Sequence, residues 1–180
     1  MTLAFTKVAI IGAGAMGRGI AQIAAQAGSQ VWLYDTQAEA IEKARDAVFQ
    51  QWDKLQEKGR LTPEAVAGHK SRLLGAASMQ DLAECELVVE AIVEKLDIKK
   101  SLFTELEKVL APSAVLVTNT SSLSVTAIAA ALQRPAQFAG YHFFNPVPLM
   151  KVVEVIAGLK TDPSVCQRLS DFASQMGHTP

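Results

Sequence analysis

Short apolar runs alternate with longer amphipathic stretches along the chain. The apolar runs that predict strands are residues 7–11, 30–34, 87–92, 114–118, 138–142 and 152–156. Amphipathic stretches lie between most of them, such as residues 15–26, which end before Gly28, and residues 96–110, which end before Pro112. This alternation is typical of a parallel sheet with helices on its faces. The third and fourth runs are apolar enough to predict strands buried on both faces.

The segment after the second predicted strand departs from the simple alternation. Residues 36–58 carry a narrow apolar stripe, and a helix of that length would extend about 33 Å at about 1.5 Å per residue. Gly59 ends this helix, a capping pattern at residues 62–64 begins another, and the next short strand comes only near Leu73. The expected fold is therefore α/β, a doubly wound (Rossmann) and mostly parallel sheet with a helical hairpin inserted after the second strand.

Composition narrows the possible classes of protein. Hydrophobic residues make up 49% of the 180 residues, which is enough to bury a core as one domain and excludes a disordered or fibrous chain. The 17 basic and 18 acidic residues nearly balance, so nucleic acid is not an expected partner. Residues 1–7 lack the pattern of a signal peptide, and no apolar run approaches the length of about 20 residues of a membrane span.

The two cysteines complete this compositional argument. Cys85 and Cys166 stand 81 positions apart, with no second cysteine or close histidine that would make a metal-binding pair. We expect two reduced thiols, no metal site and a cytoplasmic location. His69 and His178 are expected in loops, without a functional role.

A glycine-rich segment joins the first predicted strand to the first predicted helix. It reads Gly12-Ala13-Gly14-Ala15-Met16-Gly17. Between a strand and a helix, Gly12 permits the tight turn, Gly14 lets the backbone approach a pyrophosphate, and Gly17 lets the helix pack closely on the strand. The helix N-terminus adds amide donors and a positive dipole. The segment therefore predicts binding of a dinucleotide.

An acidic residue follows the second predicted strand. Asp35 stands where a carboxylate can accept hydrogen bonds from the adenosine ribose hydroxyls and would repel a 2′-phosphate. Arg45 lies a turn or more further along and is not placed to offset that repulsion, so the expected cofactor is NAD rather than NADP. Asp35 could also cap the helix expected to start near Thr36, and the two roles are compatible.

Three further segments point to a family. They are Val89-Glu90-Ala91-Ile92-Val93-Glu94, Asn119-Thr120-Ser121-Ser122-Leu123, and the block from His142-Phe143-Phe144-Asn145-Pro146 through Ile156. With the glycine-rich segment they closely resemble the 3-hydroxyacyl-CoA dehydrogenases of fatty-acid β-oxidation and of aromatic-acid degradation, such as that of phenylacetate. The resemblance covers essentially the whole chain, and the His-Phe-Phe-Asn-Pro block is specific to the family rather than to its fold. It implies reversible oxidation of a 3-hydroxyacyl-CoA to a 3-oxoacyl-CoA by hydride transfer to NAD.

The resemblance assigns His142 and Glu154 as a catalytic pair. His142 falls at the family's general base, and an imidazole, whose ordinary pKa is about 6.5, suits removal of a proton from a secondary alcohol. Glu154 falls at its carboxylate partner, which would orient the ring and stabilise the imidazolium. From the residues alone, His142 could instead be tied to the backbone at a strand end, and Glu154 could face water on an edge strand.

Four other positions match family site residues. The hydroxyl of Ser121 would align the substrate's 3-oxygen or the cofactor; no Gly-x-Ser-x-Gly elbow makes it a nucleophile, and helix capping suits the serines after it better. Asn145 matches an asparagine beside the nicotinamide and the histidine, and could also be a turn residue before proline. Glu94 and Lys99 match positions that flank the nicotinamide ribose, although alone they would pass for a surface charge and a first-turn lysine.

The resemblance also implies how coenzyme A is bound and how the protein continues beyond Pro180. Lys54 and Lys58 could contact the phosphates or the pantetheine; Lys58 matches a family contact, but Gln51 replaces a serine found in some relatives, and a solvated helix face is an equal alternative. Family members continue into an all-helical C-terminal domain that supplies a substrate-binding asparagine and the dimer interface. We therefore expect residues 1–180 to be one NAD-binding domain of a longer homodimeric protein, and turnover to need the missing part.

Two other functions are compatible with parts of this pattern. A dehydrogenase of free β-hydroxy acids shares the glycine-rich start, but that group normally uses a catalytic lysine on a later helix and lacks the His-Phe-Phe-Asn-Pro block. A non-enzymatic NAD-binding or structural relative would share the fold, and the presence of His142 and Glu154 argues against it.

Overall fold

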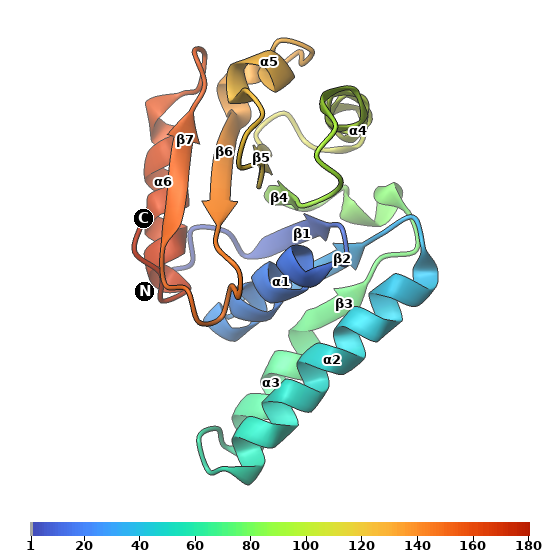
Figure 1. Cartoon of the computed structure of the whole chain (residues 1–180), viewed down its shortest axis with the longest axis vertical. Coiled ribbons are helices and arrows are strands. Elements are labelled where there is room, and N and C mark those ends of the chain that lie inside the picture. The colour runs from blue at the N-terminus through green and yellow to red at the C-terminus, as the bar shows by residue number, and fades with distance from the viewer. Residues whose placement is uncertain (1) are drawn as a thin grey trace.

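The computed structural model describes residues 2–180. Met1, the first residue of the segment 1–7 that lacks a signal-peptide pattern, lies outside the described residues. Seven strands form one sheet in the order β3-β2-β1-β4-β5-β6-β7 (Figure 1). They are β1 (Lys7–Ile11), β2 (Gln30–Tyr34), β3 (Leu73–Gly75), β4 (Leu87–Glu90), β5 (Val115–Thr118), β6 (Phe138–Phe143) and β7 (Val153–Ala157). Strands β1 to β6 are parallel, and β7 is an antiparallel edge strand. The doubly wound, mostly parallel sheet predicted from the sequence is confirmed.

Helices cover both faces of this sheet. They are α1 (Ala15–Ala27), α2 (Ala38–Glu57), α3 (Pro63–Arg72), α4 (Leu96–Val109), α5 (Val125–Ala129) and α6 (Pro163–Gln175), with short 3-10 turns η1 (Met79–Leu82) and η2 (Pro135–Gln137). In β1, Val8 belongs to the core cluster that contains α1, α2, α3 and α6, whereas Ala9 belongs to the cluster that contains α4 and α5. Because successive strand side chains point to opposite faces, these are two cores, one on each face.

Local signals in the sequence set several helix ends. Gly28 ends α1 with φ 111°, a left-handed conformation that glycine adopts without strain, and its N–H donates to the carbonyl of Ala25. Thr62 caps α3 by accepting from the N–H of Ala65 at 3.2 Å. Tertiary contacts moved other boundaries. The strand predicted over residues 87–92 ends at Glu90, because the N–H of Ile92 donates to the Glu90 side chain at 2.8 Å.

The start of α2 corrects one expectation. The helix begins at Ala38 with Gln37 as its N-cap residue, not near Thr36. Asp35 accepts from the N–H of Gln37 at 3.0 Å and from the N–H of Ala13 at 2.9 Å, so the chain turns once more before the helix starts. Asp35 therefore does not cap α2, and its carboxylate holds the glycine-rich loop instead.

Helices α2 and α3 form the predicted hairpin, which projects from the sheet (Figure 1). Trp52 is fully buried between them, with its ring centroid 5.4 Å from that of His69, and Lys70 pairs with Asp53 at 2.6 Å. His69 therefore lies in helix α3. The expectation from the sequence that it lies in a loop is wrong. Burial, together with the nearby Arg72 guanidinium, lowers the pKa of His69.

The C-terminal segment lies against the edge of the sheet. Thr179 forms a bridge with Val152, and the buried ring of His178 lies with Nε2 3.0 Å from the carbonyl oxygen of Val147. His178 lies in a loop after α6, as expected, although its side chain is buried. Cys85 is a free thiol whose pKa is raised to about 12 by burial. Across residues 2–180, none of the helices is long and apolar enough to cross a bilayer.

Candidate functional site

The three glycines of the loop between β1 and α1 have different surroundings. At Gly12, with φ 104°, an added Cβ would lie 2.5 Å from the carbonyl oxygen of Ala91, and at Gly17 it would lie 1.8 Å from that of Gly12. Glycine is therefore required at both positions, because any side chain would clash with the closely packed backbone. A Cβ at Gly14 would meet no atom within 4 Å, so this glycine leaves an open cradle at the helix N-terminus. A pyrophosphate approaching the backbone amides fits that space.

A pocket of about 350 Å³ lies beside this loop and includes Gly12, Tyr34 and Asp35. The Asp35 carboxylate uses one oxygen for Ala13 and the other for Gln37. Each carboxylate oxygen can accept more than one hydrogen bond, so Asp35 can still accept from ribose hydroxyls. The open cradle and this acidic side chain fit an adenosine dinucleotide without a 2′-phosphate.

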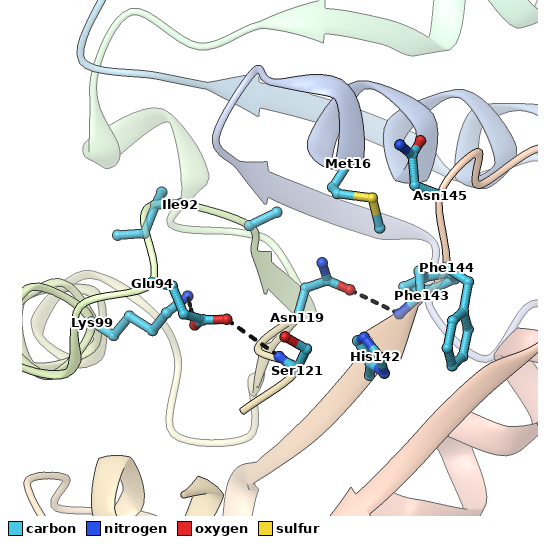
Figure 2. Close-up of a pocket in the computed structure, with 11 residues that line it drawn as sticks. Met16, Ile92, Glu94, Lys99, Asn119, Ser121, His142, Phe143, Phe144 and Asn145 are labelled. Carbon is cyan, nitrogen blue, oxygen red and sulfur yellow. Dashed lines mark hydrogen bonds and ion pairs between the residues drawn. The ribbon is translucent and has the colours of Figure 1, made fainter. Parts of the chain in front are cut away.

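A second pocket of about 350 Å³ lies where β4, β5 and β6 end (Figure 2). Its lining residues are Met16, Ala91, Ile92, Glu94, Lys99, Asn119, Ser121, His142, Phe143, Phe144 and Asn145. We call it the main pocket. Open α/β sheets bind ligands at the carboxyl ends of their strands. Ile92 also lines the pocket beside Asp35, so the two adjoin and could hold the two ends of one extended molecule.

His142 and Glu154 face each other across the antiparallel pair β6 and β7. Nδ1 of His142 lies 2.7 Å from Oε2 of Glu154. Because an ionised carboxylate only accepts hydrogen bonds, Nδ1 carries the proton and Nε2 keeps a lone pair. The side chain of Glu154 is 55% exposed on the edge strand β7. It therefore faces water and also contacts His142.

Asn119 is a site residue that sequence reasoning did not single out. It directly follows β5, and its Oδ1 accepts from the N–H of Phe143 at 2.8 Å (Figure 2). This bond ties the end of β5 to the end of β6, next to His142. A polar residue after a buried strand was the available signal, because such residues line the carboxyl edge of a parallel sheet.

Lys99 is buried in a network of charged and polar groups. Its side chain is 2% exposed, its Nζ pairs with Oε1 of the fully buried Glu90, and it lies 3.4 Å from Oε1 of Glu94. Lys99 is indeed a first-turn lysine of α4, but its side chain is buried and paired. Burial raises the pKa of Glu94, but hydrogen bonding from Thr120 and the charge of Lys99 outweigh it and lower that pKa overall.

Ser121 and Asn145 lie on two loops of the main pocket. Ser121 lies between Glu94 and His142 in Figure 2, and its N–H donates to Oε2 of Glu94 at 3.3 Å. Ser124 caps α5 by accepting from Ala127, so the expectation that a later serine takes the capping role is confirmed. Asn145 lines the main pocket near Met16.

The two lysines of the projecting helix are not brought to the main pocket. Lys54 and Lys58 line a separate hollow on α2 together with Gln51. The rest of that hollow is lined by Ala47, Gln50 and Leu55.

Comparisons with known proteins agree with the architecture and with the motifs. Residues 7–180 match the family model described as 3-hydroxyacyl-CoA dehydrogenase, NAD binding domain. A probable 3-hydroxybutyryl-CoA dehydrogenase of Deinococcus radiodurans is 46% identical over 176 residues, covering 97% of this chain and 62% of the relative. The 3-hydroxyadipyl-CoA dehydrogenase of Escherichia coli is 43% identical over 180 residues, covering 100% of this chain and 38% of the relative.

A solved structure of a relative has the same fold as this chain. The crystal structure of 3-hydroxybutyryl-CoA dehydrogenase from Escherichia coli superposes with a TM-score of 0.96 at 44% identity, covering 98% of this chain and 37% of that one. The chain thus spans 38 to 62% of the length of the two curated relatives named above. Because the family model matches residues 7–180, the chain belongs to the 3-hydroxyacyl-CoA dehydrogenase family.

Proposed function

We propose that this chain carries the cofactor site and the catalytic base of an NAD-dependent dehydrogenase that oxidises a 3-hydroxyacyl-CoA to a 3-oxoacyl-CoA. The observation that carries the proposal is the hydrogen bond of 2.7 Å between His142 and Glu154 at a pocket that adjoins the glycine-rich loop. The named relatives, 3-hydroxybutyryl-CoA and 3-hydroxyadipyl-CoA dehydrogenases, support the substrate class.

The chain's own residues would hold NAD along the two adjoining pockets. The pyrophosphate would lie on the loop Gly12, Ala13, Gly14, Ala15, Met16 and Gly17. Asp35 would accept from the adenosine ribose, and Glu94 and Lys99 would flank the ribose of the nicotinamide. Ser121 and Asn145 would contact the nicotinamide end from the two loops of the main pocket. When bound, NAD supplies the acceptor for the hydride that leaves C3 of the substrate.

His142 would act as general base through Nε2, the nitrogen left with a lone pair by the bond to Glu154. Nε2 takes the proton of the 3-hydroxyl group, and the electron pair of that O–H bond forms the second bond between C3 and oxygen. Glu154 keeps the ring oriented and stabilises the imidazolium. Ser121 and Asn145 align the 3-oxygen, so three of the four catalytic residues act on that oxygen and Glu154 acts through His142.

Coenzyme A would be bound in part by the projecting helix α2. Lys54 and Lys58, which line the hollow on α2, would contact the phosphates or the pantetheine of coenzyme A. Because the relatives are longer, we propose that a following helical domain completes the substrate site and forms a homodimer. We place the protein in the cytoplasm, where Cys85 and Cys166 would remain reduced thiols.

The test is oxidation of NADH followed by its absorbance, with acetoacetyl-CoA as substrate. It is run on the 180-residue chain and on a chain extended to the length of the curated relatives. We expect turnover in the extended chain, with NAD binding in both. Absence of turnover in the extended chain with several acyl lengths would contradict the proposal, and activity on a free 3-hydroxy acid but not on its thioester would favour the other dehydrogenase class.

A further inference from the structure

Glu90 is a buried carboxylate whose hydrogen-bonding capacity is heavily used. It is 0% exposed, its Oε2 accepts from the hydroxyl of Thr118 at 2.6 Å, and its Oε1 accepts from the N–H of Ile92 at 2.8 Å. Oε1 also pairs with Nζ of Lys99, whose side chain is 2% exposed. A buried charge is stable only when it is paired and hydrogen-bonded. Glu90 and Lys99 therefore neutralise each other in the interior.

Glu94 is the third charged member of this network and has a different environment. Its side chain is 40% exposed, it lines the main pocket, and it lies 3.4 Å from the same Lys99 ammonium. With two carboxylates and one ammonium, the network carries a net charge of −1. Since Glu90 already neutralises Lys99, the uncompensated charge lies on Glu94, at the surface of the pocket.

We propose that Glu90 is a positioning residue that sets the charge of the main pocket by reserving Lys99 for itself. Glu94 then presents one negative charge to the nicotinamide end, which is cationic in NAD⁺ and neutral in NADH. The charge favours the oxidised form of the cofactor. This inference rests on the proposed function, because it requires the nicotinamide end to occupy the main pocket.

The ratio of the two dissociation constants isolates this effect. NAD⁺ and NADH carry the same adenosine and pyrophosphate, so contacts at those parts cancel in the ratio of the Kd for NADH to the Kd for NAD⁺. Glu90→Gln leaves Lys99 to neutralise Glu94 and brings the network to zero, so this ratio falls. Lys99→Met removes the ion partner of Glu90, and because an unpaired buried carboxylate takes up a proton, the network stays at −1 and the ratio stays at that of wild type. The fall in Glu90→Gln is about threefold to tenfold, the effect of one charge in a partly solvated site.

The experiment is equilibrium titration of the 180-residue chain and its variants with NAD⁺ and with NADH, with thermal unfolding to show that each variant is folded. The expected order of the ratio is wild type and Lys99→Met together, above Glu90→Gln and Glu94→Gln. Glu84→Gln is the matched control: it removes a carboxylate that pairs with Lys7, outside both pockets, and leaves the ratio unchanged.

Several results would overturn the inference. An unchanged ratio in Glu90→Gln, or equal weakening of both cofactor forms, would show that Glu90 is only structural. If Glu90→Gln does not fold, the double variant Glu90→Gln/Lys99→Met decides, because its network returns to −1 and its ratio must return to that of wild type. Wild-type chain that binds neither form would reject the proposed function together with this inference, whereas binding without the charge order would reject the inference alone.

Discussion

The two ring nitrogens of His142 have different surroundings, and this difference assigns their roles. Nδ1 contacts Glu154 at 2.7 Å, while the ring, part of the main pocket, has its centroid 4.6 Å from that of Phe144. Because the carboxylate fixes the proton on Nδ1, the basic nitrogen is Nε2. A residue without a titratable ring nitrogen at this position cannot accept the substrate proton.

Replacement of His142 tests this assignment. In the chain that turns over acetoacetyl-CoA, His142→Gln is expected to lower kcat by about 10²-fold to 10⁴-fold, the usual loss when a general base is removed. NAD affinity should stay nearly unchanged, since the glycine-rich loop and Asp35 are intact. Steady-state kinetics and a separate NAD titration measure the two effects.

His69→Gln on the projecting α3 is the control for this substitution, and its kcat should match that of wild type. Near-native turnover of His142→Gln would remove His142 from the mechanism. Equal loss of turnover and of NAD binding would instead indicate that the ring supports the pocket as a structure.

Sequence reasoning located some site residues and missed others for a physical reason. The family resemblance assigned His142, Ser121 and Asn145, and each lies at or just after the end of an apolar run, where the strand ends of a parallel sheet meet. Glu90 and Asn119 also lie at such ends, but their roles depend on which partner each finds across the sheet. That information is tertiary, and the sequence pattern alone does not contain it.

At the level of elements, the predicted strands and helices are confirmed, with ends that shift by a few residues. The shifts occur where a side chain captures a backbone N–H, as Asp35 does at Gln37 and Glu90 does at Ile92. Periodicity reports which face of an element is buried, whereas an end depends on such single contacts. The hairpin of α2 and α3 was predictable because the apolar stripe of its first helix is longer than a helix needs in order to cover the sheet.

The loop between β1 and α1 allows packing and binding to be separated by two similar substitutions. Gly17→Ala would place a methyl 1.8 Å from the carbonyl oxygen of Gly12, so α1 must move, and the free energy of unfolding should fall by about 3 kcal/mol or more. Gly14→Ala meets no atom within 4 Å and should change it by less than about 0.5 kcal/mol.

The cofactor affinity should show the opposite sensitivity. Gly14→Ala fills the cradle that the pyrophosphate would approach, so NAD binding should weaken at least about tenfold in a protein that is folded normally. Chemical denaturation and NAD titration of both variants make the comparison. A Gly14→Ala protein that binds NAD like wild type would show that the cofactor does not approach this part of the backbone.

On the scale of the whole molecule, one core cluster joins parts that are far apart in the sequence. It contains Phe172 of α6 and also Trp52 and Val66 of the projecting hairpin. The first and last segments meet in it as well, since the ring centroid of Phe5 lies 5.4 Å from that of Phe172. A continuous core of this kind unfolds as a single cooperative unit.

Phe172→Ala therefore tests whether the hairpin belongs to that unit. The side chain is 1% exposed, and its truncation should lower the free energy of unfolding by about 3 to 5 kcal/mol. In a Trp32→Phe background, Trp52 fluorescence reports on the hairpin while far-ultraviolet circular dichroism reports on all elements. We expect both denaturation midpoints to fall together, and Leu159→Ala, which truncates a side chain that is 85% exposed, to leave both unchanged. A Trp52 midpoint that stays in place while the other falls would show that the hairpin is held by its own contacts and folds apart from the sheet.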